Sequence, residues 1–69
     1  MAKPTLAPGA SGDLVRALQH ALIANGYAVP TTGKFEEATT AALEAFQDNA
    51  ALPVRPLCDA AAWAALGPK

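Results

Sequence analysis

Large apolar side chains are scarce in this sequence, which limits the folds that the chain can adopt. Its hydrophobic fraction is 52%, but eighteen of the 69 residues are alanine, which favours helices and buries little surface. A chain of this length builds one small core at most. A compact bundle of short helices is an economical way to cover such a core. The expected core residues are Leu14, Val15, Leu18, Leu22, Ile23, Phe35, Leu43, Phe46, Leu52, Leu57, Trp63 and Leu66.

The first helical segment follows residues 1–10, which contain prolines and no periodicity and are expected to form an extended lead-in. Ser11 is the expected N-cap, and Asp13 suits the positive end of the helix dipole. Asn25-Gly26 closes the segment, because glycine tolerates the left-handed C-terminal conformation. The apolar face at helical spacing comprises Leu14, Val15, Leu18, Ala21 and Leu22.

Two further helical segments each follow a loop. In the second segment Glu36 and Glu37 lie in the first turn, where carboxylates suit the dipole. The third begins at Asp59, a good N-cap, and ends at Gly67-Pro68. The apolar positions of the second segment are Phe35, Ala38, Thr39, Ala42, Leu43 and Phe46.

These two loop-helix units repeat each other at an offset of 23 residues. The matched pairs are Phe35 and Cys58, Ala38 and Ala61, Thr39 and Ala62, and Leu43 and Leu66. The repeat predicts an all-α fold, a small three-helix bundle with a pseudo-duplicated loop-helix unit. We expect residues 11–67 to form a single domain, monomeric when isolated.

Charge and length argue against several classes of partner. The net charge is -1, with five basic and six acidic residues spread along the chain, so no basic stripe is available for nucleic acid. No apolar run approaches the length of a membrane span. The residues after Met1 do not form the apolar stretch of a signal peptide. We expect a cell-envelope location if the chain belongs to an exported protein, and otherwise a cytoplasmic or particle-associated one.

Residue types that carry catalysis do not converge in the sequence. Cys58 and His20 are the only cysteine and histidine, and the spacing directs His20 away from the core whereas Cys58 takes an apolar position. One cysteine with one histidine does not supply a metal site. Glu36 and Glu37 are adjacent and diverge on a helix. We therefore expect no catalytic residues, no metal and no cofactor.

An ordered set of motifs covers nearly the whole chain. It resembles the peptidoglycan-binding domain found beside bacterial and phage wall hydrolases. The motifs are Gly9-Ala10-Ser11-Gly12-Asp13-Leu14-Val15, Leu18-Gln19-x-x-Leu22-x-x-x-Gly26-Tyr27, Gly33-x-Phe35, Thr39-x-x-Ala42-Leu43-x-x-Phe46-Gln47, Leu52 and Trp63-x-x-Leu66. The resemblance implies three helices around a small core, a shallow ligand surface near the loops, and non-covalent attachment of a linked enzyme or particle to the glycan-peptide wall. The alternative is a protein partner, with the scaffold serving as an adaptor or structural subunit of a phage tail or contractile injection assembly.

The sequence departs from the family pattern in its two loops, residues 28–35 and 53–58. Where the family carries Asp-Gly before the Phe and Gly after it, this chain has Thr32-Gly33 and Glu36. In the second loop Arg55-Pro56 replaces a similar Asp-Gly, Asp59 replaces a glycine, and Ala62 replaces the Thr before the Trp. Such replacements imply altered loop shapes, since glycine permits positive φ.

The candidate ligand-binding residues are Tyr27, Thr32, Gly33, Lys34, Arg55 and Trp63. Tyr27 and Trp63 could stack on sugars or pack as partly buried core aromatics. Lys34 and Arg55 head equivalent loops and could bind peptide carboxylates or remain solvated charges. Gln19 and Gln47, at family motif positions, are expected to hydrogen-bond loop backbone and so to act architecturally.

Overall fold

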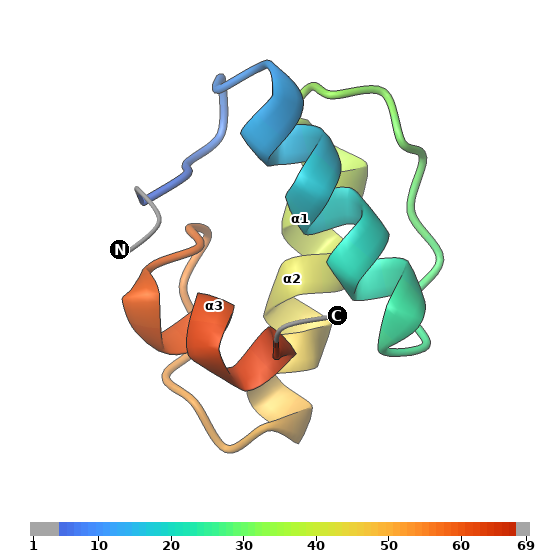
Figure 1. Ribbon diagram of the computed structural model, residues 1–69. Coiled ribbons are helices and arrows are strands. Elements are labelled where there is room, and N and C mark those ends of the chain that lie inside the picture. The colour runs from blue at the N-terminus through green and yellow to red at the C-terminus, as the bar shows by residue number, and fades with distance from the viewer. Residues whose placement is uncertain (1–4, 68–69) are drawn as a thin grey trace.

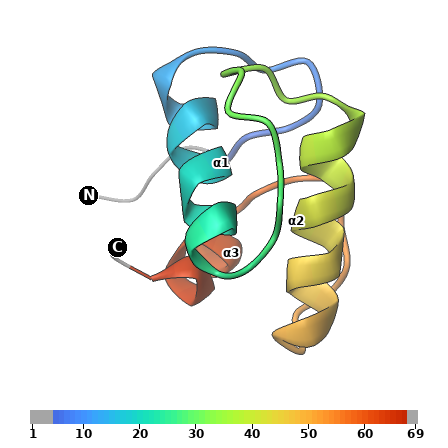
Figure 2. The ribbon, with the colours of Figure 1, turned by 90° about the vertical axis from the view of Figure 1, so that its right-hand side faces the viewer.

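A computed structural model describes residues 5–67 of the chain. Within them the helices are α1 (Asp13–Ala24), α2 (Glu37–Asn49) and α3 (Ala60–Leu66). Helices α1 and α2 run in the same general direction, and the loop between them, residues 25–36, returns along one side of the molecule (Figures 1 and 2). Helix α3 lies across the lower end in Figure 1, where Asn25 Nδ2 at the end of α1 donates to Leu66 O at 3.3 Å. The predicted all-α class is confirmed.

The core lies between the three helices and the loops. Its fully or nearly fully buried apolar residues are Leu6, Val15, Leu18, Leu22, Val29, Phe35, Ala42, Leu43, Phe46, Cys58, Ala62, Trp63 and Leu66. Most of the predicted core is confirmed, and Leu52 and Leu57 are half-buried. The prediction is wrong for Leu14 and Ile23, which are 41% and 45% exposed. At about 100° per residue they lie roughly 90° to either side of the buried stripe of α1, so both flank the core.

Helix α1 begins one residue later than the N-cap prediction. Gly12, not Ser11, is the N-cap, with φ 118° and ψ -167°, a backbone conformation that residues other than glycine rarely adopt. Ser11 instead pairs with Lys34 in an antiparallel bridge, and Gly12 N donates to Gly33 O at 2.8 Å. The backbone pairing between the lead-in and the loop therefore sets the start of this helix.

Helices α2 and α3 also begin where the chain leaves a loop. Phe35 is buried ahead of α2 rather than within it, and Ala38 is exposed, contrary to the predicted face. Ala38 lies roughly 100° from the centre of the buried stripe, at about 100° per residue. Asp59 is the N-cap of α3 as predicted, since its Oδ1 accepts from Ala62 N at 3.1 Å. Gly67 ends α3 with φ 85°, and Pro68 lies outside the described residues.

Helices α1 and α2 end in the same hydrogen-bond pattern. Tyr27 N donates to Leu22 O, and Leu52 N donates to Gln47 O, both at 2.9 Å, as in a Schellman motif. The left-handed residue that the motif needs is Gly26 in α1, at φ 94°, and Ala51 in α2, at φ 61°. Ala51 is the only non-glycine residue with positive φ within residues 5–67.

Replacing Ala51 with glycine is therefore expected to stabilise the protein. An L side chain in the left-handed region costs about 1–2 kcal/mol, and the added freedom of glycine in the unfolded chain offsets part of this. We expect a net gain of about 0.5 kcal/mol in the free energy of unfolding, measured by urea denaturation. The matched control, Ala45→Gly on the exposed face of α2, should cost about 1 kcal/mol. A loss at both positions would contradict the prediction.

The lead-in is hydrogen-bonded to both loops. Leu6 and Cys58 exchange backbone bonds in an antiparallel bridge, with N to O distances of 2.9 and 2.7 Å. Three and four residues further along the lead-in, Gly9 N donates to Phe35 O at 3.0 Å and Phe35 N donates to Ala10 O at 2.9 Å. Phe35 and Cys58, which make these backbone bonds, are equivalent in the 23-residue repeat, so the lead-in contacts the same place in both units. Residues 1–4 of the predicted lead-in lie outside the described residues.

Candidate functional site

The buried amide of Gln19 holds the first loop. Its Oε1 accepts from Gly33 N at 2.9 Å, and its Nε2 donates to Lys34 O at 3.0 Å. The same Nε2 also lies 3.0 Å from Thr39 Oγ1 and 3.4 Å from Thr32 Oγ1. Gln19 has no exposed surface, so these bonds form in a low-dielectric interior. The predicted architectural role of this glutamine is confirmed.

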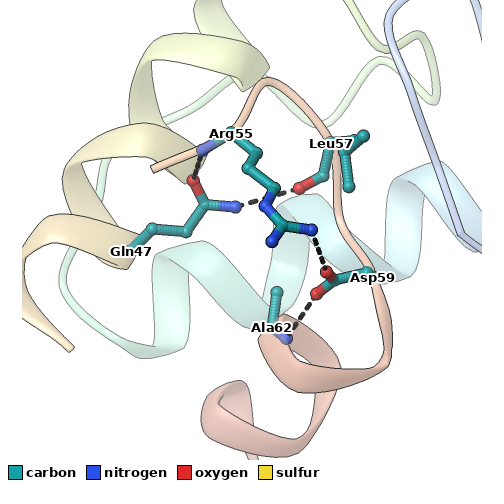
Figure 3. Close-up of polar contacts among 5 residues, drawn as sticks. All are labelled: Gln47, Arg55, Leu57, Asp59 and Ala62. Atoms are coloured by element: carbon teal, nitrogen blue, oxygen red, sulfur yellow. Dashed lines mark hydrogen bonds and ion pairs between the residues drawn. The ribbon is translucent and has the colours of Figure 1, made fainter. Parts of the chain in front are cut away.

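Gln47 performs the equivalent task in the second loop. Its Oε1 accepts from Arg55 N at 2.8 Å and its Nε2 donates to Leu57 O at 2.9 Å (Figure 3). The carbonyl oxygens of Lys34 and Leu57 accept hydrogen bonds from the two glutamine side chains, and these two residues are equivalent in the 23-residue repeat. Pro56 takes the place of Gly33 and has no N–H, so Gln47 Oε1 accepts from Arg55 instead. The pseudo-duplication is thus visible in the hydrogen bonds.

The first loop presents three of the candidate residues. Thr32 is exposed, and its Oγ1 accepts from Lys34 N at 3.2 Å. Gly33 is buried at φ 79°, and a Cβ built there would lie 3.2 Å from Arg16 Nη2. Lys34 is exposed at the edge of a shallow depression of about 280 Å³ that it shares with Gly9, Ala10, Ser11, Phe35 and Glu36. Gly33 therefore shapes the loop backbone, whereas Thr32 and Lys34 are accessible.

The second loop presents Arg55 beside a smaller pocket. The Arg55 guanidinium lies 3.5 Å from Asp59 Oδ2 and points toward it across the loop (Figure 3). Because the side chain of Asp59 is bound both to Arg55 and to Ala62 N, it is fixed at the start of α3. The pocket has a volume of about 70 Å³. Its walls are Gln47, Leu52, Pro53, Arg55, Asp59, Ala61 and Ala62.

The two aromatic candidates pack in the interior. The Tyr27 ring meets Phe46 edge-on, with ring centroids 6.0 Å apart, and its hydroxyl lies 2.6 Å from Asn49 Nδ2. Tyr27 is half-buried and Trp63 is 9% exposed. Both thus adopt the core packing that the sequence left open as one alternative.

The six candidates are not brought together in one site. The depression at Lys34 and the pocket at Arg55 share no residue. Sequence reasoning missed the pocket walls contributed by Leu52, Pro53 and Asp59, although the 23-residue repeat held a signal. It matches Thr39, whose hydroxyl accepts from Gln19, with Ala62, which has no hydroxyl.

The reactive side chains do not converge in the described part of the chain. His20 is exposed on α1, whereas Cys58 is completely buried. No group of three His, Cys, Asp or Glu side chains within residues 5–67 could hold a metal ion. Across the same residues, each helix is too short or too polar to cross a bilayer.

Comparison with known proteins places this arrangement in a family. Residues 11–66 match the peptidoglycan binding domain family. The fold is similar to the N-terminal domain of SleB, with 38% identity and a TM-score of 0.86, covering 91% of this chain and 88% of that domain. It is also similar to an endolysin of the Burkholderia phage AP3, with 31% identity and a TM-score of 0.91, covering 93% of this chain but 25% of the endolysin.

A third similar structure is a peptidoglycan-binding protein from Clostridioides difficile, solved in complex with glutamine hydroxamate. Identity is 31% and the TM-score is 0.90, over 93% of this chain and 40% of that protein. No curated protein sequence matches the chain. Because the family match spans 11–66, most of the described residues, the chain belongs to the peptidoglycan binding domain family.

Proposed function

We propose that this chain is a non-catalytic module that binds the peptidoglycan of the cell wall and concentrates whatever it is linked to on that surface. The observation that carries the proposal is the family match over residues 11–66, which includes both glutamines that hold the loops. Similarity to the N-terminal domain of SleB and to a phage endolysin supports it. On this proposal the module acts at the cell envelope and performs no chemistry of its own.

The loops are suited to binding because their backbones are already ordered. Gln19 and Gln47 each bind a loop N–H and a loop carbonyl from inside the core. A surface held in its binding conformation loses little conformational entropy when the ligand binds. Within this proposal the exposed side chains of Thr32, Lys34 and Arg55 contact the wall. Gly33, Tyr27 and Trp63 support the loops from within.

Sedimentation with purified sacculi tests the proposal. The wild-type chain should sediment with the wall material, and the double variant Lys34→Ala/Arg55→Ala should bind at least about tenfold more weakly, because both exposed loop cations are lost. The control variant Ala41→Glu/Ala45→Glu reaches the same net charge on the exposed face of α2 and should bind like wild type, apart from a small general repulsion.

Two outcomes count against the proposal. Wild-type protein that stays in the supernatant at every salt concentration removes wall binding altogether. Co-purification with a large particle, combined with no affinity for sacculi, selects the adaptor function instead. A third outcome concerns the contact residues alone. If both double variants lose binding equally, Lys34 and Arg55 make no specific contact with the wall, and net charge alone accounts for the attraction.

A further inference from the structure

The amide of Gln47 has a hydrogen-bond donor that the described residues leave unused. Gln47 is 2% exposed, and its Nε2 carries two hydrogens. One of them is donated to Leu57 O, and within residues 5–67 the other has no acceptor. The equivalent Nε2 of Gln19 has acceptors in Lys34 O and Thr39 Oγ1. The two halves of the pseudo-repeat therefore differ by one satisfied donor.

The cause of this difference is the residue at position 62. In the first unit Thr39 supplies the hydroxyl that fills the space beside the glutamine amide. Its equivalent in the second unit is Ala62, which is shorter and has no acceptor. The space that the hydroxyl would fill is open beside Ala62, and both Gln47 and Ala62 line the 70 Å³ pocket. The pocket thus combines open volume beside Ala62 with a buried hydrogen-bond donor in its wall.

The remaining walls define what this pocket can hold. Arg55 supplies further N–H donors, the Asp59 carboxylate supplies an acceptor, and Leu52, Pro53, Ala61 and Ala62 supply apolar carbon. The volume of about 70 Å³ corresponds to roughly five water-sized positions at about 15 Å³ each, which suits a group of a few heavy atoms. Arg55 and Asp59 lie 3.5 Å apart and neutralise each other's charge. A charged ligand would therefore be repelled by one of these two side chains, which favours a neutral ligand.

We infer that this pocket, which we call the Gln47 pocket, binds a neutral secondary amide next to a methyl group. Its carbonyl oxygen accepts from Gln47 Nε2 and the Arg55 guanidinium, its N–H donates to Asp59, and its methyl group packs against Leu52 and Ala62. Two components of a glycan-peptide mesh offer this chemistry, the acetamido group of an amino sugar and an alanyl peptide bond. The inference rests on the proposed function, because it names the part of the wall that this loop recognises.

Titration of the whole chain, followed by 1H–15N NMR, tests the inference. N-acetylglucosamine and N-acetylalanine methylamide are the two amide probes, and glucosamine and acetate are the controls that lack the neutral amide. We expect saturable shifts of the Gln47 side-chain amide with at least one amide probe, at roughly millimolar affinity for so small a contact. The probe that binds more tightly identifies the source as sugar or peptide. Equal shifts with glucosamine, or larger shifts with acetate, would overturn the inference.

A variant that fills the pocket supplies the second arm. Ala62→Thr restores the hydroxyl found in the first unit, and this hydroxyl should accept a hydrogen bond from Gln47 Nε2. The variant should keep or raise the thermal midpoint of unfolding and bind the amide probe at least tenfold more weakly. The same substitution at exposed Ala65 in α3 should leave probe binding unchanged. Undiminished probe binding in a folded Ala62→Thr variant overturns the inference. If the chain binds sacculi but the Gln47 side-chain amide does not shift with either probe, the inference fails and the proposed function stands. If the Gln47 amide shifts but the chain does not bind sacculi, only the proposed function fails.

Discussion

Replacing Gln19 with leucine is expected to destabilise the protein by about 4 kcal/mol, most of the stability of a domain this small. The substitution leaves Gly33 N–H and Lys34 C=O without their side-chain partner and removes the bond to Thr39. Each buried polar group left unsatisfied costs about 1–3 kcal/mol. The free energy of unfolding, measured by urea denaturation with circular dichroism at 222 nm, should therefore fall sharply, or the variant should be unfolded in buffer.

The neighbouring residue provides the control for Gln19. His20 is exposed on the same helix, so His20→Ala should change the free energy of unfolding by no more than about 0.5 kcal/mol. A Gln19→Leu variant that loses less than about 1 kcal/mol would show that water or a shifted loop replaces the amide, and the architectural role of Gln19 would fail. NMR shifts confined to residues 32–35 in such a variant would identify the shifted loop.

The second large effect is expected at Leu18. Its side chain has no exposed surface, so truncation to alanine removes buried apolar area and leaves a cavity. Leu→Ala changes at such sites cost about 2–5 kcal/mol. We expect a loss of about 3 kcal/mol, measured by urea denaturation with an unchanged dependence on denaturant concentration, because the surface exposed on unfolding stays nearly the same.

Leu14 is the matched control, because it receives the same substitution one helical turn earlier. Its side chain is 41% exposed, so Leu14→Ala should cost no more than about 1 kcal/mol. Equal losses at the two positions would mean that Leu14 belongs to the core, as its spacing alone suggests. The comparison therefore measures where the edge of the buried stripe of α1 lies.

Most of the fold follows from local patterns in the sequence. Apolar spacing, Asp59 as an N-cap, and Gly26 and Gly67 as terminators are confirmed in the three helices. The errors lie at the edges of those patterns. Leu14 and Ala38 lie within one helical turn of core residues, but on the flanks of the buried stripe of their helix. The width of a buried stripe depends on what packs against the helix.

The candidate site was less accessible from sequence. The motif positions of Gln19 and Gln47 predicted their bonds to loop backbone, since buried amides at those places need partners. The pocket at Arg55 could not be predicted, because its walls come from the end of α2, the second loop and α3. The comparison of Thr39 with Ala62 in the 23-residue repeat indicated that the two units differ there.

By itself, then, the sequence determined the three helices, most of their ends and the residues able to form a core, since these depend on spacing and on the conformations of single residues. Tertiary structure decided where α1 begins, because pairing of Ser11 and Gly12 with the loop places a glycine at the N-cap. It also decided that Lys34 and Arg55 face separate depressions. Those outcomes depend on contacts between segments far apart in the chain, which no local pattern encodes.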